Sequence, residues 1–118
     1  MRSWLSAALL VAACGTEPAA APPTDAIDSC SQSYLTYENF GAPFVSNWCR
    51  GCHSAALAED QRQMAPLDVN FDSQLEVDAL AADIRTHATG AAADMPPAGG
   101  PSDDERSLLA EWLSCGAP

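Results

Sequence analysis

The chain has 118 residues, in which 16 acidic residues outnumber five basic ones and give a formal net charge of −11 at pH 7. This length leaves room for one small domain and argues against a second. Nucleic acid is a poor partner for so acidic a surface. The charge either steers the protein toward a basic docking patch on a partner protein or only keeps it soluble.

Residues 1–13 have the pattern of a secretory signal peptide: Arg2 is positive, residues 4–13 are largely apolar, and small residues close the stretch. The apolar stretch is too short to span a bilayer. It ends in VAAC at residues 11–14, which resembles the lipobox of bacterial lipoproteins. We therefore expect lipid on Cys14 to anchor the exported protein to a bacterial membrane, on the periplasmic or the cell-surface side. The alternative is an ordinary signal peptide that is cleaved elsewhere.

Residues 14–29 consist mostly of alanine, proline, threonine and acidic residues, which predicts a flexible, lipid-anchored linker. The folded domain then spans residues 30–118, a size at which exported domains often need a disulfide, a metal or a cofactor. Cys30 and Cys115 lie near its two ends, and export favours a disulfide between them. The alternative leaves both thiols free, or joins one of them to another chain.

Residues 37–48 carry apolar side chains at three- and four-residue spacings, which predicts a helix with one apolar face. Pro43 would lie in the first turns of this helix or kink it. The helix would place the sequence CRGCH, residues 49–53, at its C-terminal end. Its apolar side chains are Tyr37, Phe40, Phe44, Val45 and Trp48.

Two cysteines separated by two residues and followed by histidine serve three kinds of chemistry. A thioredoxin-like redox site needs a βαβ setting, and the chain has no alternating run that predicts such a sheet. A structural zinc site needs a second pair of ligands, for which His53 and the distant His87 are the remaining candidates. In covalent haem attachment, Cys49 and Cys52 bond to the haem vinyl groups and His53 ligates the iron. Export favours haem, because bacteria attach this cofactor outside the cytoplasm.

Residues 73–90 predict a second helix, which begins with a capping box of Ser73 and Glu76 and ends at Gly90. Its buried stripe would consist of Leu75, Val77, Leu80 and Ile84.

The next stretch, DMPPAGG at residues 94–100, cannot form a regular helix because of its prolines and glycines. Met95 offers a soft thioether from this proline-stiffened loop, which suits the second axial position of a low-spin haem iron. The alternative is a surface or gap-filling methionine. Met64 and His87 are rival ligands: Met64 lies close to His53 in the sequence, and His87 falls inside the helical pattern.

Residues 102–115 predict a third helix, with a capping box of Ser102 and Glu105 and a stop at Gly116. The first and last helices are expected to cross, with the disulfide joining the ends of the domain. The apolar face of the last helix would consist of Leu108, Leu109, Trp112 and Leu113.

The CRGCH motif followed by Met95-Pro96-Pro97 resembles a single-haem class I cytochrome c domain over roughly residues 33–115. The resemblance implies an all-α fold wrapped around one covalent haem c, with His53 and Met95 on opposite faces. Family members often place a proline about a dozen residues past the histidine, and its carbonyl accepts a hydrogen bond from the ligand's other ring nitrogen. Pro66 matches that proline, although Ala65 replaces the glycine that often precedes it. Arg62 either approaches a haem propionate or lies in solvent.

With both axial positions filled by the protein, the sequence predicts an electron carrier and not an enzyme, tethered to the membrane near its redox partner proteins. Two alternatives remain at this stage. One is a haem-based sensor or scaffold module in which a small ligand displaces Met95. The other is a haem-free lipoprotein that uses Cys49 and Cys52 as a thiol or zinc clip.

Overall fold

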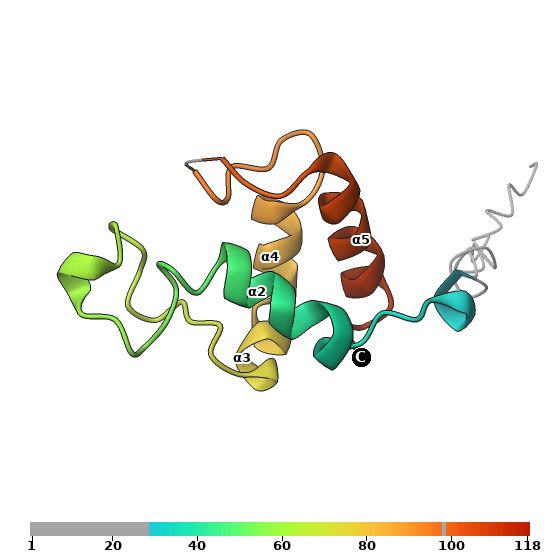
Figure 1. Cartoon of the computed structure of the whole chain (residues 1–118), viewed down its shortest axis with the longest axis horizontal. Helices are drawn as coiled ribbons and strands as arrows, with labels where there is room; N and C mark the ends of the chain where they lie inside the picture. Colours follow the sequence, from blue (N-terminus) through green and yellow to red (C-terminus); the bar gives the residue numbers. More distant parts are fainter. Residues whose placement is uncertain (1–28, 98) are drawn as a thin grey trace, which may run out of the picture.

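The computed structural model describes residues 29–97 and 99–118, and these residues form helices joined by loops, with no strand among them (Figure 1). The all-α class predicted from the sequence is confirmed for this part of the chain. None of the described helices has the length and apolar character that crossing a bilayer requires. The predicted signal peptide, Cys14 and the linker up to residue 28 lie outside the described residues.

The predicted helix over residues 37–48 exists as two consecutive segments. A π-helical turn, η1, covers Tyr37–Gly41, and the α-helix α2 covers Ala42–Trp48. Thr36 caps the start: its Oγ1 accepts from the Asn39 amide at 3.2 Å, and Asn39 Oδ1 accepts from the Thr36 amide at 2.8 Å. Pro43 lies in the first turn of α2, directly after η1, and its missing N–H interrupts the series of hydrogen bonds from residues 41 and 42 back to Thr36 and Tyr37.

The helix predicted over residues 73–90 is broken in two. Helix α3 covers Gln74–Ala79 and α4 covers Ala81–Ala88, with Leu80 between them at φ −108° and ψ 12°. The Ser73 hydroxyl caps α3 by accepting from the Glu76 amide at 3.3 Å. The second half of the predicted capping box is absent, because the Glu76 carboxylate accepts from the Ser73 hydroxyl instead of from its backbone amide.

The buried stripe predicted for this region is correct except for Leu75. Val77 and Ile84 are buried and Leu80 is half-buried, whereas the Leu75 side chain is 78% exposed. Residues two apart on a helix point to nearly opposite sides, so Leu75 and Val77 cannot share one face. The three- and four-residue spacings of the other members let them face the same core.

Helix α5 covers Asp103–Ser114 and begins with the predicted capping box of Ser102 and Glu105. Gly116 follows the helix with φ 85°, a conformation that glycine adopts at little cost. Arg85 on α4 donates to the Ser114 hydroxyl at 2.9 Å, which ties the two helices together. The face that α5 turns to the core consists of Leu109, Trp112 and Leu113, with Leu108 half-buried.

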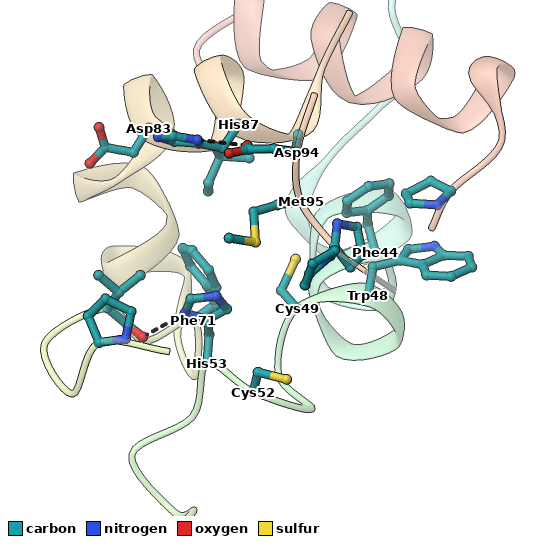
Figure 2. Close-up of a pocket in the computed structure, with 17 residues that line it drawn as sticks. Phe44, Trp48, Cys49, Cys52, His53, Phe71, Asp83, His87, Asp94 and Met95 are labelled. Atoms are coloured by element: carbon teal, nitrogen blue, oxygen red, sulfur yellow. Dashed lines mark hydrogen bonds and ion pairs between the residues drawn. The ribbon is translucent and has the colours of Figure 1, made fainter. Parts of the chain in front are cut away.

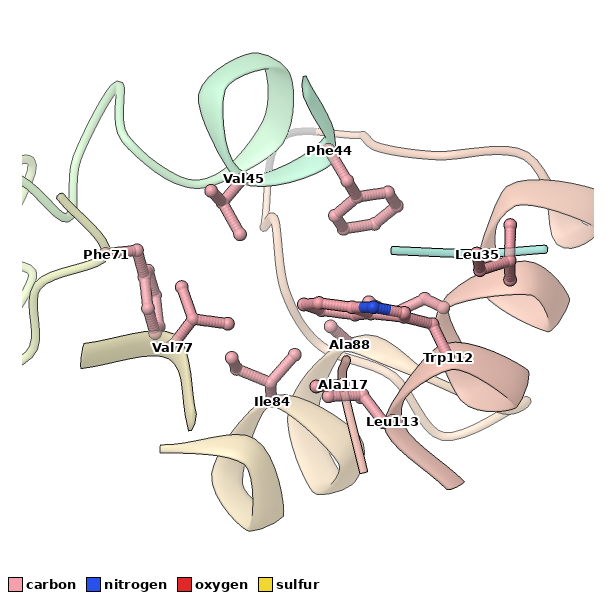
Figure 3. Close-up of a cluster of buried hydrophobic side chains, with 11 residues drawn as sticks. Leu35, Phe44, Val45, Phe71, Val77, Ile84, Ala88, Trp112, Leu113 and Ala117 are labelled. Carbon is pink, nitrogen blue, oxygen red and sulfur yellow. The ribbon is translucent and has the colours of Figure 1, made fainter. Parts of the chain in front are cut away.

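Trp112 lies at the centre of the core, with its side chain fully buried among residues from every described α-helix (Figure 3). Its ring centroid is 6.5 Å from that of Tyr37 and 6.0 Å from that of Phe40, so the first and last helices are in contact. The carbonyl of Pro118 accepts from both the Tyr37 amide and Trp112 Nε1. The end of the chain is therefore held against η1.

The predicted disulfide between Cys30 and Cys115 is present, with a Cα–Cα distance of 5.3 Å. It joins the helical turn at residues 29–32 to the end of α5 and closes almost the whole described domain into one loop. The predicted linker therefore overlaps the folded part at Ser29, which already belongs to that turn.

The connection between α2 and α3 is long and contains one short 3₁₀-helix, η2, at Glu59–Gln61. In Figure 1 this connection extends away from the helices, to the side opposite the helical turn at residues 29–32. Two polar residues inside it, Ser54 and Arg62, are nevertheless buried. The loop therefore has an interior of its own, which hydrogen bonds must satisfy.

Candidate functional site

The CRGCH motif starts where α2 ends and continues as a tight turn. The Cys49 amide donates to the Val45 carbonyl at 2.9 Å, and the Cys52 and His53 amides donate to the Cys49 carbonyl at 3.1 and 2.9 Å. These bonds wind the motif so that both thiols and the imidazole leave the chain within one turn. Cys49 and Cys52 are not disulfide-bonded, and both are half-buried.

The motif opens onto an apolar cavity of about 330 Å³ (Figure 2). Cys49, Cys52 and His53 line one part of it, and Met95 with the two prolines that follow it lines another. A cavity of this size, with apolar walls and few polar groups, has the character of a small-molecule or cofactor site. Its remaining apolar walls include Phe44, Trp48, Val69, Phe71 and Ile84.

His53 is held by three contacts with the segment just before α3. Its Nδ1 lies 3.1 Å from the Val69 carbonyl, its own carbonyl accepts from the Phe71 amide at 3.1 Å, and its ring centroid is 5.3 Å from that of Phe71. A carbonyl can only accept, so Nδ1 carries the proton of the neutral ring. The lone pair of Nε2 is then available to ligate a metal.

The hydrogen bond to His53 predicted for the Pro66 carbonyl is made by Val69 instead. The Pro66 carbonyl accepts from Arg62 Nη2 at 2.5 Å, and the Val69 amide donates back to it at 3.2 Å. The chain therefore turns between Pro66 and Val69, and the carbonyl that reaches His53 is that of Val69, at the end of the turn. Pro66 still lines the cavity.

Met95 is presented by the loop between α4 and α5 and lines the cavity, and in Figure 2 its side chain lies between His87 and the motif residues. Its amide donates to the His87 carbonyl at 2.9 Å, and its carbonyl accepts from Arg106 Nη1 at 3.0 Å. Arg106 also donates to the Ala88 carbonyl at 2.7 Å, so one guanidinium joins the Met95 loop to the end of α4. Met95 itself is 38% exposed.

The two rival ligands differ in position. Met64 is 98% exposed and does not line the cavity. His87 does line it, and its Nδ1 forms a hydrogen bond of 2.8 Å with Asp94 Oδ1. This hydrogen bond lowers the pKa of the Asp94 carboxyl. The structure thus brings Met95 and His87 to the same cavity as His53 and leaves Met64 outside.

Burial raises the pKa of the Cys49 thiol to about 11. This thiol is therefore neutral at neutral pH, unlike the thiolates of thiol redox sites, whose pKa is lowered by their surroundings. Among the described residues, no three side chains of His, Cys, Asp and Glu are grouped so that they could hold a metal ion by themselves.

Asp72 is a residue of the site that the sequence reasoning missed. Its carboxylate accepts from the Ser54 hydroxyl at 2.6 Å, the Ala55 amide at 2.7 Å and Arg50 Nε at 3.0 Å. These hydrogen bonds, that of Ser54 first, lower the pKa of Asp72. One carboxylate thus binds a residue inside the motif and the two residues that follow it, and no local sequence pattern signals this long-range contact.

Comparisons of the chain with protein-family models, with curated proteins and with solved structures gave no match. The residues present fit a covalently bound haem on their own chemistry. Two thiols for the vinyl groups and an imidazole with a free Nε2 line one apolar cavity with a thioether, and nitrogen and sulfur suit low-spin iron.

Proposed function

We propose that this protein is a membrane-tethered electron carrier with one covalent haem c. The observation that supports this most directly is a shared cavity. It is lined by Cys49, Cys52 and His53, which precede α3 in the sequence, and by Met95, which follows α4. Burial in apolar surroundings and the choice of axial ligands are the means by which a protein sets the potential of such a group.

Each of these residues has a distinct task in the proposal. Cys49 and Cys52 would hold the cofactor through thioether bonds. His53 donates its Nδ1–H to the Val69 carbonyl and would offer Nε2 to the iron. Met95 would offer its sulfur as a second ligand, and the hydrogen bonds of its backbone to His87 and Arg106 hold the loop in place. When bound, the haem supplies a one-electron couple.

With His53 and Met95 both as ligands, the iron would have no open position for a substrate, which favours electron transfer. The formal net charge of −11 favours redox partners with a basic docking patch, with an association rate that falls as salt rises. Lipid on Cys14 and the following linker would confine the domain to the neighbourhood of the membrane on which those partners work.

The test begins with the full chain, exported in a bacterium that attaches haem to exported proteins. Mass spectrometry of the purified protein should show one added haem, bonded through both Cys49 and Cys52. Its visible spectrum should be that of a six-coordinate, low-spin haem in both oxidation states. A protein of unmodified mass, with the two thiols oxidised to a disulfide or bound to zinc, would favour the haem-free clip.

The assignment of Met95 is tested with a matched pair of variants. Met95→Ala should bind added imidazole in the oxidised state and carbon monoxide in the reduced state. Met64→Ala removes an exposed methionine outside the cavity and should behave as wild type. An unchanged spectrum and no ligand binding in Met95→Ala would remove Met95 from the proposal, and His87→Ala then tests the other side chain at the cavity. Tight carbon monoxide binding by the wild type would favour a sensor.

A further inference from the structure

Arg62 is the most deeply buried charged side chain among the described residues, with 1% of its surface exposed, although it lies in the long loop between α2 and α3. Neither position predicted from the sequence, contact with a haem propionate or exposure to solvent, agrees with the structure. Arg62 does not lie in solvent, and its N–H groups already point to acceptors of the protein, so it has none to offer a propionate. Its hydrogen bonds run from Nη1 to Ser54 O at 2.6 Å and Asn70 Oδ1 at 2.7 Å, from Nη2 to Pro66 O at 2.5 Å and Val69 O at 2.9 Å, and from Nε to Ala65 O at 3.4 Å.

All of these acceptors are neutral oxygens. Among the described residues, the salt bridges are those of Arg50 with Asp72 and His87 with Asp94, and neither includes Arg62. A buried charge that is hydrogen-bonded but has no counter-ion keeps a long-range positive field, because little water is present to screen it. Besides the hydrogen bonds that hold the loop between α2 and α3, Arg62 therefore contributes a positive charge to the interior of that loop.

One of those oxygens connects Arg62 to the proposed ligand. The Val69 carbonyl accepts from Arg62 Nη2 at 2.9 Å and also lies 3.1 Å from His53 Nδ1. A carbonyl bonded to the outer nitrogen of a ligating histidine normally makes the imidazole a stronger donor to the metal. A cation on the same oxygen draws electron density away from the ring's hydrogen bond, so the imidazole gives less charge to the iron.

We propose that Arg62 is a positioning residue that fixes the Val69 carbonyl against His53 and, through that shared oxygen and its own charge, keeps the reduction potential of the centre high. This inference rests on the proposed function. Both effects act in the same direction: a weaker imidazole donor and a nearby positive charge each disfavour the oxidised state, which carries one more positive charge.

The experiment compares three variants of the haem-loaded full chain by spectroelectrochemical titration. Arg62→Met removes the charge and its hydrogen bonds. Arg62→Lys keeps the charge but has fewer donors and a different shape. Arg85→Met is the matched control, because Arg85 is exposed and bonds only to the Ser114 hydroxyl among the hydrogen bonds seen for its side chain.

Arg62→Met should shift the ratio of reduced to oxidised protein at a fixed potential about tenfold toward the oxidised form, a fall of about 59 mV for a one-electron couple. Arg62→Lys should lie between this value and the wild type, and Arg85→Met should stay close to the wild type. A low-spin Arg62→Met protein with the same potential as Arg85→Met overturns the inference.

A wild-type measurement covers the case in which Arg62→Met does not fold. In the reduced haem protein labelled with ¹⁵N-histidine, the Nδ1 proton of His53 should be visible and protected from exchange with solvent. Rapid exchange of that proton overturns the inference, because the shared Val69 carbonyl would then not hold it. A wild type that carries no covalent haem overturns the proposed function itself, and this inference with it, so mass spectrometry distinguishes the two failures.

Discussion

Gly41, at the junction of η1 and α2, faces the indole of Trp112, and the structure predicts the outcome of adding one methyl group there. A Cβ at Gly41 would lie 2.5 Å from Trp112 Cζ2, 2.6 Å from Cη2 and 2.9 Å from Tyr37 Cδ2. All three distances are too short for carbon atoms in contact. Gly41→Ala therefore forces either the indole or the η1 backbone to move.

The size of the effect follows from two opposing contributions. Gly41 has helical dihedrals, φ −58° and ψ −56°, so alanine would fit the backbone and stabilise by about 0.4–1 kcal/mol through the unfolded chain. Overpacking a core costs about 1–3 kcal/mol. The upper part of that range applies, because Trp112 is fully buried and its Nε1 bonds to the Pro118 carbonyl at 3.3 Å. We expect a net loss of about 2 kcal/mol, or roughly 10 °C in Tm for a domain of this size.

Thermal unfolding followed by circular dichroism measures this loss on proteins with the same haem content. Gly51→Ala is the matched control, since a Cβ at Gly51 meets nothing within 4 Å, and its Tm should stay near that of the wild type. A Gly41→Ala protein that unfolds at or above the wild-type temperature would refute the packing argument, because it would show that there is space for a methyl group between Gly41 and Trp112.

Three further predictions concern the disulfide, the Met95 loop and acid stability. Replacing Cys30 and Cys115 by serine should lower the free energy of unfolding by about 4 kcal/mol, from the closure of a loop with a sequence separation of 85; a loss below about 1 kcal/mol in urea unfolding would contradict this. Arg106→Met removes the charged donor to Met95 O and Ala88 O, so imidazole should bind the oxidised haem protein about tenfold more tightly, in a spectroscopic titration where Arg85→Met shows no such gain. The pKa of Asp72 is lower in the fold than in the unfolded chain, so its contribution to stability is complete above about pH 4 and is lost as the pH falls through the folded value. Denaturant unfolding at a series of pH values should therefore show a shallower acid slope for Asp72→Asn than for the wild type, and equal slopes would rule out this role.

The features that the sequence predicts well depend on short segments. The Ser102 capping box and the Gly116 stop each need only a few consecutive residues, and both are present in the structure. The pairing of Cys30 with Cys115 followed from export and from their positions near the two ends of the domain, and neither argument requires the tertiary fold. Met95 and the CRGCH motif line one cavity. The sequence predicted that they share a site because a haem bound by the motif would need a second ligand to its iron.

The features that the sequence did not predict depend on loops without periodicity. The acceptor for His53 Nδ1 is Val69 and not Pro66, because the turn between these two residues is set by Arg62 from inside the loop. An isolated arginine in a polar stretch suggests exposure, and only the folded loop shows that carbonyl oxygens surround it. The break at Leu80 is similar, since the apolar spacing continues across it while the backbone does not.

The two proposed axial ligands are held by different parts of the molecule. Val69 and Phe71 contact His53 and Arg62 holds the Val69 carbonyl, and all three residues lie within the connection between α2 and α3. Those that hold Met95 come from the His87 carbonyl on α4 and from Arg106 on α5, and α5 in turn is joined to the start of the domain by the disulfide. Contacts within one loop thus hold His53, whereas the helices α4 and α5 hold Met95. Local opening of α5 would therefore release Met95 and leave the surroundings of His53 intact. The asymmetry is consistent with the burial of Arg62: a loop with few buried apolar side chains depends on an internal hydrogen-bond donor to hold its shape.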